Sequence, residues 1–380
     1  MTHPAQPGDS VAAIDTPALV LDLDAMERNL ARMATFAREH RLRLRPHAKM
    51  HKSAELARLQ MAHGAVGVCV QKTSEAEALA AGGVNNIYIS NEVVAPHKLA
   101  RVATLAQRLA QGGGQLAIAV DSAQGVAALA QAMHQAHGAH IDVFIDIDVG
   151  HGRCGVPAGE PALVLARAIA PHHALRLAGL HAYHGSAQHQ RSPADRQASL
   201  AHAAQAVRDT RDLLIRHGFG PLLVTGAGTG TFSLEAASGL WGELQVGSYL
   251  FMDADYAANQ TDPQHLPFEH ALFVKSQVMS RQGDRAVCDA GHKSHAIDSG
   301  LPMVFSPAGL AFANGGDEHG VLRAATADAA LPAIGDTVWL IPGHCDPTVN
   351  LHNVLVGVRG GLLGGFVERL IRVDARGALT

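Results

Sequence analysis

The chain has 380 residues, 47% of them hydrophobic and 17% charged, so a large buried core is feasible and a disordered chain is excluded. The formal net charge of −4 argues against a nucleic-acid-binding protein, which needs a basic stripe, and no apolar run could cross a membrane. The first ten residues lack the pattern of a signal peptide, and the four cysteines form no CxxC pair. We therefore expect reduced thiols in a cytoplasmic protein.

The predicted elements begin with a strand over residues 16–23 and a helix that starts near Asp24, with Glu27 as its capping-box partner. Short apolar runs then alternate with helical patterns. The runs cover residues 41–48, 66–70, 87–90, 116–121, 141–148, 177–183, 222–225 and 243–247. Examples of the helical patterns are 53–63, 96–111, 122–137, 159–172 and 195–217, the last preceded by a Ser-Pro cap at 192–193. Eight strands separated by helices predict an α/β fold, a (β/α)8 barrel.

Beyond residue 265 helical patterns nearly vanish, and β-like runs at 271–280, 285–291, 336–343 and 354–361 are separated by glycine and polar turns. We therefore predict a barrel over residues 20–265 and a C-terminal all-β domain over 266–380, joined by residues 1–19. The segment 16–23 could belong to either part.

Polar residues follow nearly every predicted barrel strand, at the end where such barrels carry their active sites. If residues 42–49 form a strand, Arg45, His47 and Lys49 point into the barrel, whereas Lys52 falls outside that register. A lysine at the barrel mouth beside Arg45 has a lowered pKa and can form a Schiff base. A solvated charge cluster is the alternative explanation.

Several motifs occur together in order along nearly the whole chain: RPHAKMHK, QKTSEAEAL, ISNEVV, DVGHGRCGV, AYHGSAQH, TGAGTGTF, LQVGSYLFMDADY, GDEHG and PGHCDPT. In this combination the sequence resembles the alanine racemase-like pyridoxal 5'-phosphate (PLP) enzymes, and the D-threonine aldolases in particular. The resemblance implies that Lys49 holds PLP covalently and that Arg153 stabilises the charge of the cofactor's phenolic oxygen.

The resemblance also suggests a phosphate site. Close backbone approach at glycine-rich turns suits phosphate, and barrels often bind it after strands seven and eight. The residues implied are Gly228, Thr229, Gly230, Gly247, Ser248 and the hydroxyl of Tyr183. Ordinary glycine turns are the alternative. Where racemases place an arginine against the pyridine nitrogen, this chain has Gln245, and an uncharged partner there should damp the electron sink.

His344 and Asp346 stand two residues apart, so on an extended segment both point the same way. By the resemblance they bind a divalent metal, Mn²⁺ first and Mg²⁺ or Co²⁺ as alternatives, whereas the related D-serine dehydratases carry a softer His-x-Cys pair suited to zinc. Cys345 should face away. A polar turn before Pro347 would explain the triplet without a metal.

The implied reaction is the retro-aldol cleavage of a small D-3-hydroxy amino acid, with His189 as the base and His184 as its rival. Alternatives are a dehydratase on the same scaffold, a non-catalytic PLP-binding protein and an amino-acid racemase. The resemblance implies a homodimer.

Overall fold

The computed structural model describes residues 3–135, 139–260 and 267–380. The chain divides into two compact units. The described residues within 33–49, 56–247 and 378–380 form the barrel unit, and those within 1–32, 50–55 and 248–377 form the β unit. These limits differ from the predicted domains, because the described residues of 20–32 and 248–265 group with the β unit. The domain boundary predicted at 265/266 lies outside the described residues.

The barrel unit is built on a parallel sheet with strand order β2-β10-β9-β8-β6-β5-β4-β3. The strands are β2 (Arg43–Leu44), β3 (Val68–Val70), β4 (Asn86–Ile89), β5 (Gln115–Val120), β6 (Ile141–Asp148), β8 (Leu175–Ala182), β9 (Leu223–Gly226) and β10 (Glu243–Leu244), with the short β7 (Val156–Pro157) beside β6. A parallel bridge between His47 and Cys69 joins the chain after β2 to β3 and closes the sheet on itself. The predicted eight-stranded barrel is confirmed.

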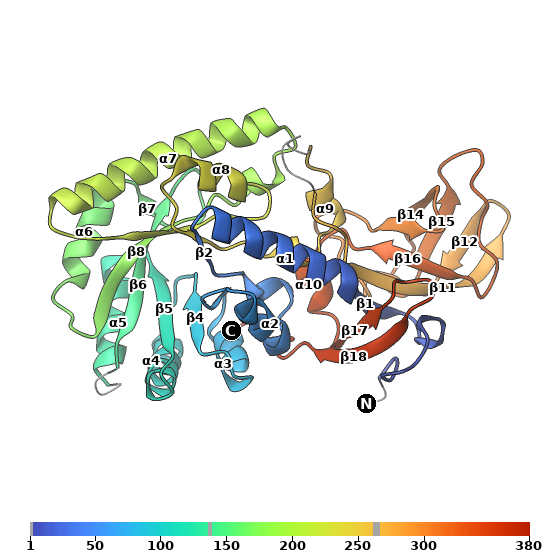
Figure 1. Ribbon diagram of the computed structural model, residues 1–380, viewed down its shortest axis with the longest axis horizontal. Helices are drawn as coiled ribbons and strands as arrows, with labels where there is room; N and C mark the ends of the chain where they lie inside the picture. The colour runs from blue at the N-terminus through green and yellow to red at the C-terminus, as the bar shows by residue number, and fades with distance from the viewer. Residues whose placement is uncertain (1–2, 136–138, 261–266) are drawn as a thin grey trace. The chain divides into compact units, whose positions relative to one another are not determined.

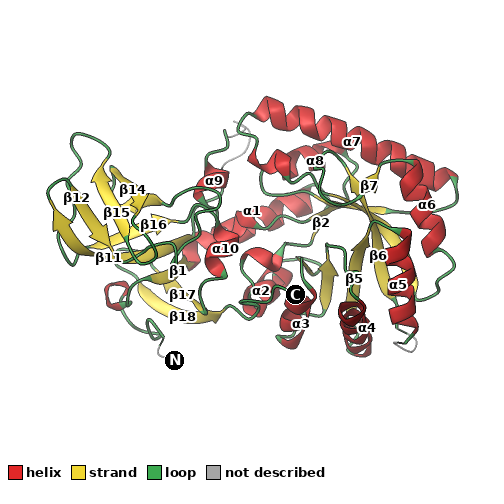
Figure 2. Cartoon of the chain, turned by 180° about the vertical axis from the view of Figure 1, so that it is seen from behind, coloured by secondary structure: helices red, strands yellow, loops and turns green. Residues whose placement is uncertain are grey.

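Helices cover the outer face of this sheet, as Figures 1 and 2 show for α4 to α7. They are α2 (Ala54–Ala62), α3 (Thr73–Ala81), α4 (Pro96–Gln111), α5 (Ala123–His134), α6 (Glu160–Ile169), α7 (Pro193–Arg216) and α8 (Phe232–Ser238). Inside the sheet, Tyr88 and Phe144 pack with ring centroids 4.9 Å apart among buried small residues. Helices cover the outer face of the strands, and this apolar cluster fills part of the interior.

One local prediction needs correction. The helix α1 (Leu23–Glu39) is capped by Asp22, whose Oδ1 accepts the amide of Ala25 at 3.1 Å, and not by a capping box. The carboxylates of Asp24 and Glu27 instead each lie 2.8 Å from Nη1 of Arg359. All three residues belong to the β unit. The helices α3 and α8 lie between predicted strands, as the alternation of strands and helices predicts, and the predicted end of the α5 segment at residue 137 lies outside the described residues.

The β unit holds a sheet of order β14-β15-β12-β11-β1-β17-β18, with β16 pairing both β11 and β13. Its strands are β1 (Ala18–Asp22), β11 (Leu272–Gln282), β12 (Arg285–Cys288), β13 (Met303–Ser306), β14 (Leu310–Asn314), β15 (Gly320–Ala324), β16 (Thr337–Ile341), β17 (Val354–Arg359) and β18 (Phe366–Arg372). The N-terminal strand β1 therefore belongs to this unit, antiparallel to β11 and parallel to β17.

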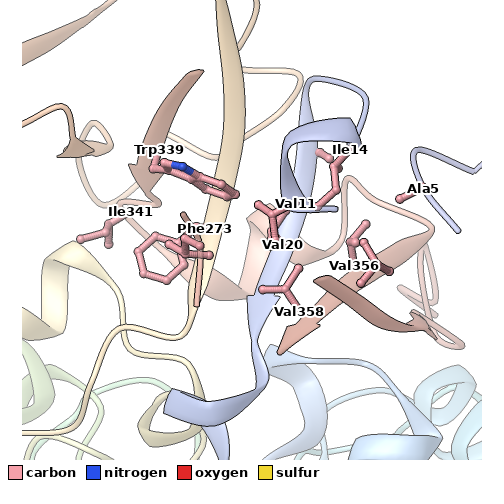
Figure 3. Close-up of a cluster of buried hydrophobic side chains, with 12 residues drawn as sticks. Ala5, Val11, Ile14, Val20, Phe273, Trp339, Ile341, Val356 and Val358 are labelled. Atoms are coloured by element: carbon pink, nitrogen blue, oxygen red, sulfur yellow. The ribbon is translucent and has the colours of Figure 1, made fainter. Parts of the chain in front are cut away.

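The core of the β unit forms where the N-terminal segment meets the sheet (Figure 3). Val11 and Ile14 pack with Phe273, Trp339 and other buried apolar side chains of the strands. The four cysteines are free thiols, as their spacing predicted. Within the described ranges no helix has the length and apolarity to span a membrane.

Candidate active site

Lys49 lies on a single 3-10 turn, η2 (Ala48–Met50), and not on a strand, because β2 ends at Leu44. The prediction that Lys49 lies at the end of a strand is therefore wrong. The turn is held by His47, whose Nδ1 accepts the Lys49 amide at 3.4 Å and whose Nε2 lies 3.2 Å from Ser90 Oγ and 2.9 Å from Gln71 Nε2. These three side chains fix the backbone of Lys49 at the barrel mouth.

The two candidate lysines have different surroundings. Lys49 is half-buried in the barrel unit, whereas Lys52 is buried in the β unit, where its Nζ donates to the carbonyl oxygen of Ala375 at 3.4 Å. Arg45 is engaged elsewhere, since its Nε lies 3.0 Å from Glu243 and its Nη1 donates to Asn86 at 2.7 Å. Glu243 neutralises the charge of this guanidinium. The structure therefore does not support the prediction that Arg45 activates the amine of Lys49.

Arg153 stands on a tight loop after β6. Asp148 Oδ1 accepts the amides of Gly150, His151 and Gly152 at 2.9, 2.9 and 3.1 Å, and these bonds lower the pKa of Asp148 against the opposing effect of burial. The guanidinium of Arg153 lies over the ring of Tyr183, 5.8 Å from its centroid, within the range of a cation–π contact. The loop thus presents a cation beside an aromatic ring at the barrel mouth.

A group of acidic side chains that sequence reasoning missed lies beside this loop. The ligand atoms of Glu92, Asp121 and Cys154 lie within 4.8 Å of one another. Burial and the neighbouring charge of Glu92 raise the pKa of Asp146 to about 9, and burial and Glu92 raise that of Cys154 to about 11. Both groups are therefore protonated at neutral pH. Glu92, Asp121 and Cys154 follow β4, β5 and β6, whereas Asp146 lies within β6, so the position of polar residues after successive strands was the signal for the first three.

The glycine-rich turn after β9 is partly occupied by a side chain. Gln188 Oε1 accepts the amide of Gly230 at 2.9 Å, and a Cβ on Gly228 would lie 2.4 Å from the same oxygen. Close packing against Gln188 therefore explains both glycines without a phosphate, and the Gly230 amide is not available to one. The amides of Gly228 and of Gly247, which follow the neighbouring strands β9 and β10, donate to no atom of the described residues.

The other predicted cofactor residues lie in or next to the barrel unit. Thr229 and Gln245 are buried in it, whereas Ser248, also buried, is the first residue of this segment of the β unit. Gln245 Nε2 lies 2.8 Å from Thr225 Oγ1 and 3.2 Å from His181 Nδ1. The side-chain nitrogen of Gln245 is therefore held by Thr225 and His181.

The two candidate bases follow β8. His184 is buried, with Ser186 Oγ 3.2 Å from its Nδ1, and burial lowers its pKa although the charge of Asp148 opposes this. His189 is exposed at the end of the short turn η3 (Ser186–His189). A neutral imidazole at His184 can accept a proton, and so can the solvent-accessible imidazole at His189.

His344 and Asp346 lie in the β unit, where His344 precedes the short helix α10 (Cys345–Val349). The prediction of an extended segment is wrong, but the two side chains still meet, with 3.8 Å between His344 Nε2 and Asp346 Oδ1. Cys345 points away, as predicted, and its Sγ contacts the carbonyl oxygen of Met252. Two metal–ligand bonds of about 2.1 Å can bridge this separation, so the pair suits one divalent ion.

Asp298 holds the other side of the imidazole, with its Oδ2 2.7 Å from His344 Nδ1. Burial disfavours the imidazolium, but the carboxylates of Asp346 and Asp298 outweigh it and raise the pKa of His344. A carboxylate on Nδ1 directs Nε2 toward a metal, an arrangement common in metalloproteins. Sequence reasoning missed Asp298 because 46 residues separate it from His344.

The alanine racemase N-terminal domain family matches residues 21–255, and a serine dehydratase domain matches residues 271–358. A D-threonine aldolase of Arthrobacter sp is 46% identical over 98% of this chain and 96% of that protein. The chain belongs to the D-threonine aldolase family. A 3-hydroxy-D-aspartate aldolase of Paracoccus denitrificans is 43% identical over 98% of the chain and 95% of its own length. The crystal structure of D-threonine aldolase from Filomicrobium marinum superposes with a TM-score of 0.94 at 47% identity, covering all of both chains.

The residues present suit the PLP that this family implies. A lysine stands on a turn at the mouth of the parallel barrel, and the amides of Gly228 and Gly247 are open for an anion after neighbouring strands. Arg153 supplies a cation on the loop after β6. The donor set of the β unit, an imidazole and a carboxylate, likewise suits a divalent metal.

Proposed function

We propose that this protein is a lyase that cleaves D-3-hydroxy amino acids by a retro-aldol reaction, releasing glycine and an aldehyde. The observation that carries the proposal is the end-to-end likeness to a protein named D-threonine aldolase, 46% identical over 98% of the chain. For D-threonine the products are glycine and acetaldehyde. The second relative, a 3-hydroxy-D-aspartate aldolase, makes a D-amino acid with a 3-carboxylate the next substrate to try.

The roles that we propose for the residues are supported by the resemblance and by their positions. Lys49 binds PLP, with the amides of Gly228 and Gly247 and the hydroxyls of Thr229, Ser248 and Tyr183 directed at its phosphate. Arg153 stabilises the charge of the phenolic oxygen. PLP, when bound, supplies the acceptor for the electron pair of the broken Cα–Cβ bond. The Gly230 amide is left out of this set because Gln188 already occupies it.

His344 and Asp346 hold the divalent metal, with Mn²⁺ proposed first and Mg²⁺ or Co²⁺ as alternatives. A metal in this position supplies Lewis acidity that makes the 3-hydroxyl of the substrate easier to deprotonate. His189 removes the hydroxyl proton, and His184 is the alternative base. We also propose that the protein is a cytoplasmic homodimer.

The test is an assay of the purified protein with D-threonine, D-allo-threonine and L-threonine, before and after EDTA treatment, with acetaldehyde trapped as it forms. We expect both D-isomers to be cleaved, L-threonine to be inert, and Mn²⁺ to restore the activity lost to EDTA. Formation of 2-oxobutanoate and ammonia would indicate the dehydratase instead. Comparable cleavage of L-threonine would contradict the proposal.

The base is assigned by two alanine variants compared side by side. His189→Ala should lower the rate by about 10²–10⁴-fold, the usual contribution of a general base. His184→Ala is the matched control and should still take up PLP. A fully active His189→Ala protein together with an inactive His184→Ala protein would move the role to His184.

A further inference from the structure

A continuous line of polar side chains crosses the inside of the barrel unit. Glu243 on β10 is fully buried, and its carboxylate lies 3.0 Å from Arg45 Nε and 3.1 Å from Arg43 Nε. Thr225 Oγ1 on β9 lies 2.9 Å from Glu243 Oε1, and Gln245 Nε2 lies 2.8 Å from the same hydroxyl. The parallel pairing of Thr225 with Glu243 places these groups on neighbouring strands.

The direction of each hydrogen bond in this line is fixed from its charged end. A carboxylate between two guanidinium groups carries no proton and can only accept, so the hydroxyl of Thr225 must donate to Glu243. That hydroxyl has then used its only hydrogen and can only accept from Gln245. The group of Gln245 that faces Thr225 is therefore the NH₂ group, and the amide cannot turn over without losing this bond.

The second hydrogen of the same NH₂ group reaches His181 Nδ1 at 3.2 Å. Burial, together with the positive charge of Arg153, lowers the pKa of His181 to about 3, so the imidazole is neutral. Its Nδ1 must accept, and the ring proton is then on Nε2, which lies 4.0 Å from Asp146 Oδ1. Both hydrogens of the Gln245 amide are thus engaged, whereas its carbonyl oxygen accepts no bond from any described residue.

We propose that Gln245 presents its carbonyl oxygen, not its NH₂ group, to the pyridine nitrogen of PLP, and that Thr225 and Glu243 are positioning residues that set this orientation. The inference rests on the proposed function for the presence of PLP, and on the resemblance to the racemases for the place of Gln245 at the pyridine nitrogen. An oxygen that can only accept favours the protonated pyridine nitrogen, which withdraws electrons more strongly than the unprotonated one. An uncharged partner in this orientation therefore strengthens the electron sink, contrary to the expectation from the sequence.

The experiment uses the whole protein loaded with PLP that carries ¹⁵N in its ring. Wild-type protein should show the pyridine nitrogen at the upfield position of a protonated ring. Thr225→Val keeps the shape of the side chain but removes the hydroxyl, so the resonance should move downfield, whereas the matched control Thr225→Ser should keep the wild-type position. A wild-type resonance at the downfield, unprotonated position, or a Thr225→Val resonance that does not move, would overturn the inference.

A second measurement depends neither on PLP nor on the Thr225 variants. In the ¹⁵N spectrum of wild-type protein before PLP is added, His181 should be neutral with its proton on Nε2, and its signal is assigned by its loss in His181→Gln. A proton on Nδ1 would mean that Gln245 faces His181 with its oxygen, and the orientation would be wrong. Borohydride reduction separates the two proposals: protein that takes up no PLP at Lys49 contradicts both, whereas labelled protein with an unprotonated ring nitrogen contradicts this inference alone.

Discussion

The ion pair between Arg45 and Glu243 is buried in the barrel unit and should be costly to break. Arg45 is 5% exposed and Glu243 is 0% exposed, so neither charge is solvated when its partner is removed. Glu243→Leu replaces the carboxylate by a side chain of similar size and leaves the guanidinium of Arg45 uncompensated. Breaking a buried pair from one side costs about 3–5 kcal/mol. At about 2–4 °C per kcal/mol for a unit of this size, the melting temperature should fall by roughly 10 °C.

The matched control is the ion pair of Arg176 and Asp142 on neighbouring strands of the same sheet, with Arg176 Nε 2.5 Å from Asp142 Oδ1 and its side chain 63% exposed. Asp142→Leu should cost at most about 1 kcal/mol, because water solvates the arginine that remains. Thermal unfolding followed by circular dichroism compares the two variants, and Arg45→Met added to Glu243→Leu should recover part of the loss. Equal destabilisation by the two single variants would show that burial does not set the cost.

Three further results are expected. Borohydride reduction of the PLP-loaded protein and peptide mapping should place the label on Lys49, and a label on Lys52 would refute the assignment. Asp298→Asn should weaken metal binding in a titration by about 10–100-fold, whereas His344→Ala should abolish it while PLP absorbance persists in both; unchanged metal affinity in both would mean that no metal binds here. Burial raises the pKa of Glu235 from 4.5 to about 7, so its contribution to stability is fully present below about pH 4.5 and is lost as the pH rises through 7. At pH 8, Glu235→Gln should therefore be up to about 3 kcal/mol more stable than wild type in urea unfolding, and a variant that follows the wild-type pH profile would contradict the shift.

The sequence was sufficient for the elements whose signal is local. A short apolar run indicates each barrel strand, and the helical spacing of apolar residues indicates each long helix. The order of strands and helices could therefore be read from the sequence. The alternation of strand and helix in turn limits the fold to few topologies. The candidate residues Lys49, Arg153, His344 and Asp346 were found because each stands in a motif of contiguous residues.

The tertiary structure decided everything that depends on which distant segments meet. The N-terminal strand β1 pairs with β11 and β17, and no local pattern distinguishes this from a place in the barrel. Gln188 occupies the glycine turn after β9 from 42 residues away, and Arg45 pairs with Glu243 across 198 residues. Periodicity gives the face on which a side chain lies, but closing the sheet decides which charge and which hydrogen-bonding group it faces there. For this reason the sequence by itself named Gln245, whereas only the packed barrel shows which end of its amide is free.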